Sequence, residues 1–408
     1  MKVLVSGASV AGPVAAYWLS RRGDEVTVVE KAPALRKTGG HAIDLFGPAM
    51  AIAEQMGVRD RVLARATGTS ALVMHRAGAT RPTRIDYRKL STAISDRHVE
   101  IMRDDLSEIF YDAGRDDVEY VFGDHITAID DDGGVSFAHS PARRFDIVVG
   151  ADGLHSGVRR LVFGEDAGYT EFLGAYLSVV SVPKALARDG EMSGFVDVDR
   201  MAMIYTADHL DDARAVFIFR PAAAYRSAAV DHHDHRDTAA HQALLRDRFA
   251  GLSPTVDRWL GELDRTPAFY FDAVTQLQLN TWTRGRVALA GDAGYCPGPA
   301  VGGSTSLAVI GAYVLAGELE RAGGDPAAGF AAYERVMREP VLGSRALAKG
   351  VAKAILPSSG LGVRALLGVG RLVSILPTSV SGALARLNDK GIGLYDSIAV
   401  PDYPLPVR

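Results

Sequence analysis

Residues 1–33 read MKVLVSGASVAGPVAAYWLSRRGDEVTVVEKAP. An apolar run leads into a glycine-punctuated turn, a helix-forming stretch and a second apolar run that ends at Glu30. This order is typical of a βαβ unit that binds a dinucleotide: Gly7 allows the tight turn, Gly12 lets the helix pack close to the strand, and the acid binds ribose hydroxyls. Ser9 replaces the usual middle glycine, so its side chain must point away from the phosphates. The predicted contacts here are Gly7, Ser9, Val10, Ala11, Gly12, Glu30 and Lys31.

The chain has 408 residues, more than one hydrophobic core usually covers, so two or three packed units are expected. A hydrophobic content of 48% and a net charge of -4 leave no basic excess for nucleic acid. A single cysteine, Cys296, excludes an internal disulfide, and the first residues form a core strand rather than a leader, so the cytosol is the expected location. The apolar stretch at 354–377 is interrupted by Pro357, Arg364 and Arg371, so no membrane span is expected.

The order of strand and helix patterns predicts an α/β fold. A Rossmann-like dinucleotide-binding domain is expected from residues 1–68, 96–165 and 281–326. A mostly antiparallel β-sheet substrate domain is interleaved with it, from a hairpin at 69–95 and alternating strands at 166–280. A C-terminal helical region follows at 327–408.

Three separated motifs place glycine or aspartate directly after a predicted strand: GASVAG at 7–12, GADG at 150–153 and GDAGYCPGPAVGG at 291–303. In a parallel sheet these strand ends share one crevice, where cofactors bind. Asp292 is suited to accept hydrogen bonds from sugar-chain hydroxyls, although an N-cap of the following helix is an alternative. The helix that begins near Gly302 would offer free N–H groups to an electron-rich ring.

With RDDL at 103–106 and GADGLHSGVRR at 150–160, these motifs resemble the flavin-dependent (group A) aromatic monooxygenases of the para-hydroxybenzoate hydroxylase fold, over nearly the whole chain. YWLSRRG, LRKTGGHAIDL and YFDAVTQLQLNTWTRGRVALAGDAGYCP are similar to tetracycline destructases and polyketide-tailoring hydroxylases. The resemblance implies an FAD-binding domain with noncovalent FAD. It places Glu30 at the adenosine ribose, Arg103 at the pyrophosphate, Asp44 and Asp292 at the ribityl chain, Gly302 and Gly303 at the isoalloxazine, Asp152 at FAD and reductant, and Lys37 at the nicotinamide nucleotide. Further cofactor contacts are expected at His41, Ala42, Leu106 and Pro299.

The implied activity uses NADPH or NADH and O2, through a flavin hydroperoxide, to oxygenate a bulky polycyclic or polyketide-like substrate. Biosynthetic tailoring and tetracycline-type inactivation both fit, in a monomer or homodimer. No side chain is assigned as catalytic, and His41 either hydrogen-bonds flavin or substrate or faces solvent. Ser304 departs from the usual Gly-Gln-Gly step and Phe46 stands where an Arg is common, so a non-redox, FAD-scaffolded cyclase stays an alternative. A plain NAD dehydrogenase is a third interpretation.

Other residues have simpler interpretations. His232, His233 and His235 lack metal-site spacing in a polar connection, so no metal is expected. Cys296 is expected to be a small packing residue near the flavin. Aromatic residues on the predicted strands pack the sheet or line the substrate cavity; Phe217 and Phe219 share one face because strand side chains alternate. The candidates for lining are Phe46, Phe195, Tyr205, Phe217, Phe219 and Phe271.

Overall fold

The opening residues form the expected βαβ unit in the computed structural model: β1 (Lys2–Ser6), α1 (Ala11–Arg21) and β2 (Glu25–Glu30), with β1 and β2 parallel. The structure describes the chain apart from residues 37–38, 96, 222–236, 300–302, 376–391 and 404–408. The apolar residues of β1 are buried, and Trp18 of α1 is fully buried against them in the same core. The apolar residues of the first 30 positions are therefore buried nearly throughout and form part of the larger core.

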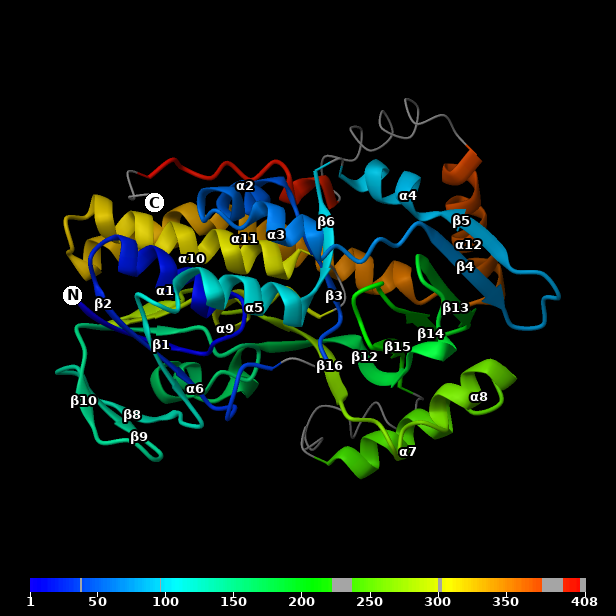
Figure 1. Ribbon diagram of the computed structural model, residues 1–408, viewed down its shortest axis with the longest axis horizontal. Coiled ribbons are helices and arrows are strands. Elements are labelled where there is room, and N and C mark those ends of the chain that lie inside the picture. Colours follow the sequence, from blue (N-terminus) through cyan, green and yellow to red (C-terminus); the bar gives the residue numbers. More distant parts are fainter. Residues whose placement is uncertain (37–38, 96, 222–236, 300–302, 376–391, 404–408) are drawn as a thin grey trace.

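Four further strands complete a six-stranded sheet around this unit. They are β7 (Glu119–Phe122), β11 (Ile147–Gly150), β17 (Thr283–Arg284) and β18 (Val287–Leu289). The strand order is β17-β18-β11-β1-β2-β7, and all neighbours are parallel except β17 and β18. The carboxyl ends of β1, β2, β7, β11 and β18 thus lie at one edge of the sheet. The sheet occupies the left-hand part of Figure 1, and β1 runs from the N-terminus toward the middle of the molecule.

A seven-stranded sheet forms the other part of the molecule. Its strands, in spatial order, are β16 (Phe269–Leu277), β12 (Thr170–Pro183), β15 (Asp212–Phe219), β14 (Arg200–Tyr205), β13 (Glu191–Asp197), β4 (Ala71–Arg76) and β5 (Thr83–Asp86). Only β13 and β4 pair in parallel within this sheet. Smaller sheets pair β3 (Ala42–Leu45) with β6 (Val99–Met102), and β8 (Ile126–Ile129) with β9 (Gly134–Phe137) and β10 (Arg143–Arg144).

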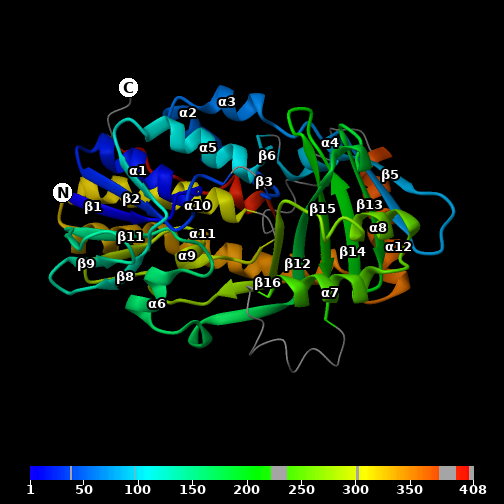
Figure 2. The ribbon, with the colours of Figure 1, turned by 60° about the horizontal axis from the view of Figure 1, so that its bottom comes forward.

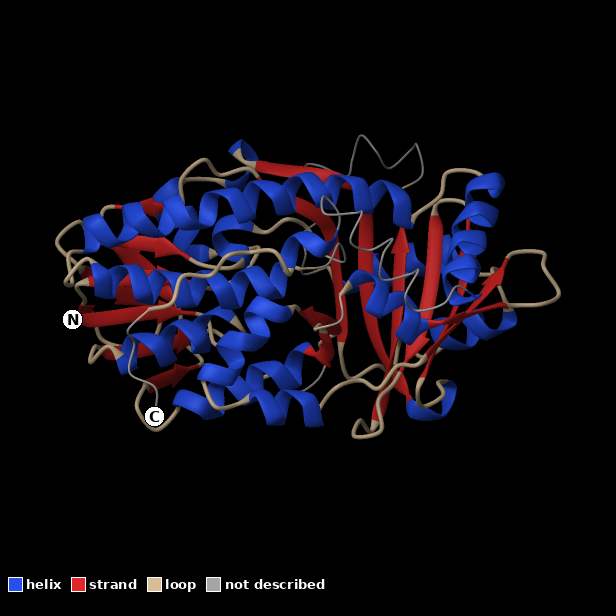
Figure 3. Cartoon of the chain, turned by 90° about the horizontal axis from the view of Figure 1, so that it is seen from above, coloured by secondary structure: helices blue, strands red, loops and turns tan. Residues whose placement is uncertain are grey.

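Helices cover both sheets, as Figure 3 shows from above. They are α2 (Gly47–Gln55), α3 (Arg59–Ala64), α4 (Tyr87–Ile94), α5 (Arg103–Gly114), α6 (Gly157–Phe163), α7 (Thr238–Phe249), α8 (Pro254–Leu260), α9 (Asp292–Tyr295), α10 (Ser304–Arg321), α11 (Pro326–Ile355) and α12 (Gly360–Ile375). Short 3-10 turns occur at Asp166–Gly168, Lys184–Leu186 and Ile392–Tyr395. The predicted fold class, a Rossmann-like domain interleaved with a mostly antiparallel sheet and followed by C-terminal helices, is confirmed.

The two faces of the seven-stranded sheet have different covers. α7 and α8 pack on one face with Phe249, Trp259 and neighbouring apolar residues, and Figure 2 shows both helices across that face. On the other face, Ala348 and Ala352 of α11 and Leu367 of α12 pack against a separate buried cluster. Each face therefore packs against its own pair of helices.

Four of the aromatic residues considered for the substrate cavity lie under α7 and α8 instead. Phe217 and Phe219 do share a face, but both are fully buried and contact Phe249, with ring centroids 5.0 and 5.6 Å apart. Phe271 and Phe195 belong to the same cluster. The cavity-lining prediction is wrong for this group, because strand alternation shows which side chains share a face but not which element covers it. Tyr205 lies in the cluster on the opposite face.

α11 belongs to both halves of the molecule. Its Tyr333 and Met337 pack in the core of the parallel sheet, whereas Ala348 and Ala352 pack in the core on the antiparallel sheet. Pro340 lies inside this 30-residue helix, between the two sets of contacts. Within the described residues, no helix combines the length and the hydropathy needed to span a membrane.

Replacing Phe217 with alanine tests the assignment of that residue to the core under α7. We expect Phe217→Ala to lower the free energy of unfolding by about 3–5 kcal/mol, because it removes a fully buried aromatic ring and leaves a cavity. Chemical denaturation followed by circular dichroism measures the change. Leu361→Ala is the control, because Leu361 is 73% exposed and its loss should change stability little. Equal effects of the two substitutions would contradict the assignment.

Candidate functional site

The turn after β1 is held against the two strands beside it. Gly7 has a φ of 105°, and its N–H donates to the Val29 carbonyl at 2.8 Å. A Cβ at Gly7 would lie 2.5 Å from the Ala151 carbonyl oxygen, and one at Gly12 would overlap the Gly7 carbonyl oxygen. A side chain at Gly7 would push the turn away from the loop after β11, and one at Gly12 would push α1 away from the turn, so both close approaches require glycine.

The carboxylate of Glu30 is fixed at the end of β2. Oε2 accepts a hydrogen bond from the Ala8 N–H, and Oε1 accepts one from the Ala32 N–H, each at 2.8 Å. These bonds connect the glycine turn to the chain after β2. Each carboxylate oxygen keeps a further lone pair, so Glu30 is still able to accept hydrogen bonds from a ligand hydroxyl.

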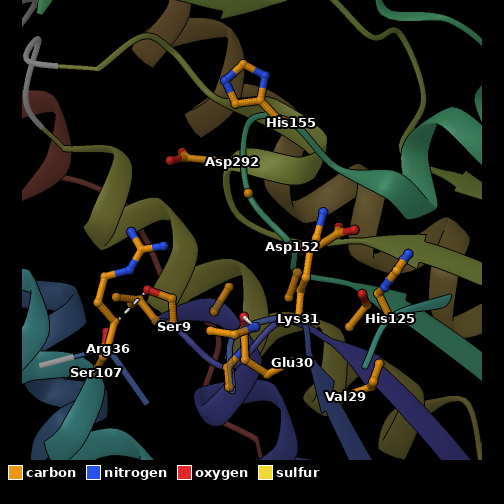
Figure 4. A pocket seen from close by; sticks show the side chains of 18 of the residues that line it. Ser9, Val29, Glu30, Lys31, Arg36, Ser107, His125, Asp152, His155 and Asp292 are labelled. Carbon is orange, nitrogen blue, oxygen red and sulfur yellow. Dashed lines mark hydrogen bonds between the residues drawn. The ribbon is translucent and has the colours of Figure 1, made fainter. Parts of the chain in front are cut away.

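A cavity of about 570 Å³ opens at this edge of the parallel sheet, lined by the ends of several strands (Figure 4). Nine residues expected to bind a cofactor line it: Gly7, Ser9, Val10, Ala11, Glu30, Lys31, Arg103, Asp152 and Asp292. The Ser9 hydroxyl lies 3.2 Å from the Ser107 hydroxyl on α5, so it is directed toward that helix (Figure 4). The predicted convergence of three distant motifs at one crevice is therefore observed.

Other expected cofactor residues lie outside the lining of this cavity. They are Gly12, His41, Ala42, Asp44, Leu106, Pro299 and Gly303. The Leu106 side chain is fully buried in the core, and Gly12 serves the turn through its missing side chain. Lys37 and Gly302 fall outside the described residues.

Arg103 joins the cavity to the turn before β3. Its backbone N–H donates to the His41 carbonyl at 3.0 Å, and its side chain lines the cavity. The buried Nε atom has no hydrogen-bond partner among the described residues. A buried guanidinium N–H without a partner is costly, so an anionic or strongly polar ligand in the cavity would be favoured.

The Asp152 carboxylate forms hydrogen bonds within its own loop, the one between β11 and α6. It accepts hydrogen bonds from the Ser156 hydroxyl, from the Gly157 N–H at 2.8 Å and from the Val158 N–H at 3.1 Å. Burial raises the pKa of Asp152, and these hydrogen bonds oppose the rise. Its carboxylate therefore fixes the start of α6 at the wall of the cavity.

A fully buried arginine connects two of the cavity loops. The Arg159 guanidinium donates to the Leu154 carbonyl and, at 2.9 Å, to the Ala293 carbonyl, and it pairs with Asp166 at 2.9 Å. The loop after β11 and the loop after β18 are thereby held together.

Asp292 is the first residue of α9, whose N-cap is Gly291, and the N-cap of α10, the helix after the Gly/Pro loop, is Gly303. The alternative that Asp292 itself caps the helix is therefore wrong. Burial raises the pKa of Asp292, while Cys296 and Arg103 oppose the rise. Cys296 is buried, with Sγ 3.9 Å from the Thr275 carbonyl, as expected for a packing residue.

A second group of titratable residues lies on the β3–β6 ribbon. Asp44 is paired in register with Glu100, which accepts hydrogen bonds from the Thr67 hydroxyl and, at 2.8 Å, from the Tyr87 hydroxyl. His98 Nε2 lies 3.8 Å from Asp44 Oδ1. Burial and the Glu100 charge raise the pKa of Asp44 to about 6, although His98 opposes the rise.

Phe46 packs beneath the C-terminal segment. It is 1% exposed and stacks on Tyr395 with ring centroids 5.2 Å apart, so its prediction as a substrate-lining residue is wrong. Tyr395 also covers Gly303, the left-handed N-cap of α10, where an added Cβ would overlap the tyrosine ring. The start of α10 is thus shaped by a residue about ninety positions later in the chain.

Several cavity residues were not predicted from the sequence: Arg36, Ser107, Asp124, His125, His155 and Arg160. Ser107 is four residues after Arg103 on α5, so helical spacing could have indicated it. Asp124 and His125 follow β7, and the strand-end rule would have included them had the place of β7 in the sheet been known. Within the described ranges, no group of three or more His, Cys, Asp or Glu residues could hold a metal, and His232, His233 and His235 lie outside those ranges.

The raised pKa of Asp44 gives a prediction that needs no ligand. We expect carbon NMR of the Asp44 carboxyl to show protonation near pH 6, and Glu100→Gln to lower that pKa because it removes the facing charge. Because the pKa is raised in the folded state, the stability from Asp44 is complete below the unfolded value of about 3.8 and is lost as the pH rises through about 6. An Asp44 titration that Glu100→Gln leaves unchanged would contradict the coupling.

Comparison with known proteins identifies the family. The family model described as FAD binding domain matches residues 1–323. An uncharacterized protein of Mycobacterium tuberculosis is 42% identical over 335 residues, which covers 81% of this chain and 88% of that protein. A flavin-dependent monooxygenase from an unknown prokaryotic organism is 36% identical over 364 residues, 88% of this chain and 91% of the relative.

The crystal structure of tetracycline destructase Tet(55) has a TM-score of 0.80 and 32% identity, and the match covers 98% of each chain. The resemblance seen in the sequence motifs is therefore confirmed. With the family match over residues 1–323 and a curated monooxygenase aligned over most of its length, this chain belongs to the FAD-binding family of flavin-dependent monooxygenases.

Proposed function

We propose that this monooxygenase uses FAD, NADPH or NADH, and O2 to add oxygen to a bulky polycyclic substrate of the tetracycline or polyketide type. The main support is the 32% identity to tetracycline destructase Tet(55). The match covers 98% of both chains, so it extends over the seven-stranded sheet and the C-terminal helices. A match confined to the nucleotide-binding part would support the cofactor alone. Antibiotic inactivation and biosynthetic tailoring are the two variants of this proposal, in a monomer or homodimer.

The residues around the cavity fit FAD. Glu30 has free lone pairs for the adenosine ribose, and Arg103 has an unpartnered buried N–H for the pyrophosphate, near the free N–H groups at the start of α1. Asp292, which lines the cavity, would accept hydrogen bonds from ribityl hydroxyls. Asp44 and Gly303 lie outside the lining, so their proposed places at the ribityl chain and the ring rest on the family resemblance alone. When bound, FAD supplies the redox chemistry that the protein side chains lack.

The proposed tasks of this chain are binding, orientation and exclusion of water. Arg159 keeps the loops after β11 and β18 together, so the reductant would meet a rigid wall that contains Asp152. His41 would present a neutral imidazole at pH 7, because burial and Arg103 lower its pKa to about 3. Tyr270 lies near it, with ring centroids 6.4 Å apart, and would border the substrate.

Reduction of bound flavin under anaerobic conditions tests this function. We expect NADPH or NADH to bleach the flavin absorbance of the purified protein, and readmitted air to restore it. With tetracycline present, reductant consumption should rise and mass spectrometry should find a product heavier by one oxygen atom. Flavin that stays oxidised with both reductants would refute the monooxygenase proposal and favour the non-redox cyclase, whereas a protein that takes up no flavin would refute FAD binding itself.

Arg103→Ala tests the pyrophosphate contact. We expect it to weaken FAD binding by about 1.5–3 kcal/mol, the range for a hydrogen bond to a charged group. Titration of the apoprotein with FAD, followed by quenching of flavin fluorescence, gives the dissociation constant. Arg115→Ala is the control, because Arg115 lies at the opposite end of α5 and outside the cavity. An FAD affinity that is the same in both variants would contradict the contact.

A further inference from the structure

The turn Gly40–Ala42 has its backbone held by side chains from other parts of the fold. The Gly40 N–H donates to Asp104 Oδ2 at 2.6 Å, and the Gly40 carbonyl accepts from Arg214 Nε at 2.9 Å. The Ala42 N–H donates to the Tyr205 hydroxyl oxygen at 2.7 Å. Three backbone groups of Gly40 and Ala42, at the entry to β3, are therefore fixed by side chains from other elements.

Two of these side chains come from the seven-stranded sheet. Arg214 of β15 and Tyr205 of β14 are paired in register, so they project as neighbours from adjacent strands. Arg214 is 2% exposed and Tyr205 3% exposed, and Arg214 also pairs with Asp212. Hydrogen bonds between buried groups are costly to leave unmade, so these two residues hold the turn firmly to the sheet.

His41 is the middle residue of this turn, between Gly40 and Ala42. The His41 carbonyl accepts from the Arg103 N–H at 3.0 Å, which ties the turn to the start of α5 and to a residue that lines the cavity. No hydrogen bond to the imidazole is present within the parts of the chain that the structure describes. Its low pKa leaves the ring neutral, with one nitrogen able to donate and the other to accept.

We propose that Arg214 and Tyr205 are positioning residues that hold the Gly40–Ala42 turn beside Arg103, so that His41, which lies outside the cavity lining, hydrogen-bonds the part of bound FAD that extends past Arg103. This inference rests on the proposed function only in that FAD is the cofactor. The seven-stranded sheet, which was predicted to bind the substrate, would then also shape the cofactor site, because its strands β14 and β15 hold the turn. Because these hydrogen bonds restrain the turn, less conformational entropy would be lost when FAD binds.

A double-mutant cycle on FAD affinity tests the proposal. We expect Tyr205→Phe, Arg214→Lys and His41→Leu each to raise the FAD dissociation constant about three- to tenfold, as for one lost hydrogen bond. In the His41→Leu background, Tyr205→Phe should have little further effect, because the residue that it positions is gone. Apoprotein titration with FAD measures these constants without reductant or substrate, so the result is independent of the monooxygenase activity.

Two matched controls separate positioning from general damage to the sheet. Tyr176→Phe alters a buried tyrosine in the cluster on the opposite face, and Arg220→Lys alters an arginine of the same region that pairs with Asp199. Both should leave FAD affinity unchanged. An unchanged FAD affinity in Tyr205→Phe, or effects of Tyr205→Phe and His41→Leu that simply add, would overturn the proposal. If Arg214→Lys fails to fold, the Tyr205 and His41 cycle decides alone.

Discussion

The contact between the turn after β1 and the loop after β11 is the constraint on which the rest of the structure depends. Gly7 lies so close to the Ala151 carbonyl that no side chain fits between them. This contact sets the spacing of the two strand ends, and the cavity lies between the loops that follow. Glu30 and Arg159 then fix the remaining loops around the same space. The site is therefore built mainly from backbone held by a few buried polar side chains.

The sequence predicted those parts of the site that follow from strand order. Gly7, Glu30, Asp152 and Asp292 come after buried strands, and parallel strands bring such positions together wherever they occur in the chain. Arg36 was missed because it lies several residues after the end of β2. His125 was missed because its place at the cavity depends on β7 being part of the parallel sheet. The boundaries between the domain segments remain a prediction.

The predictions of cavity-lining aromatic residues failed where a helix or segment distant in the sequence packs over the side chain and buries it. Phe217 and Phe219 share a face, as alternation requires, but their pattern carries no information about α7. Phe46 is buried by Tyr395, which lies almost 350 residues away in the sequence. Periodicity is a local property, whereas burial by a distant segment is a tertiary one. The same limit applies to the Gly40–Ala42 turn, whose partners on β14 and β15 have no sequence signature.

α11 packs against both halves of the molecule, and Pro340 interrupts its backbone hydrogen bonding near the middle of the helix. Pro340 has no N–H to bond the preceding turn, so the helix is least resistant to bending there. The residues before it are packed against one core and those well after it against the other. Val341 and Leu347, after the proline, still pack on the parallel-sheet core, so the two cores are joined through one continuous helix whose hydrogen bonding is interrupted on the side of the parallel sheet.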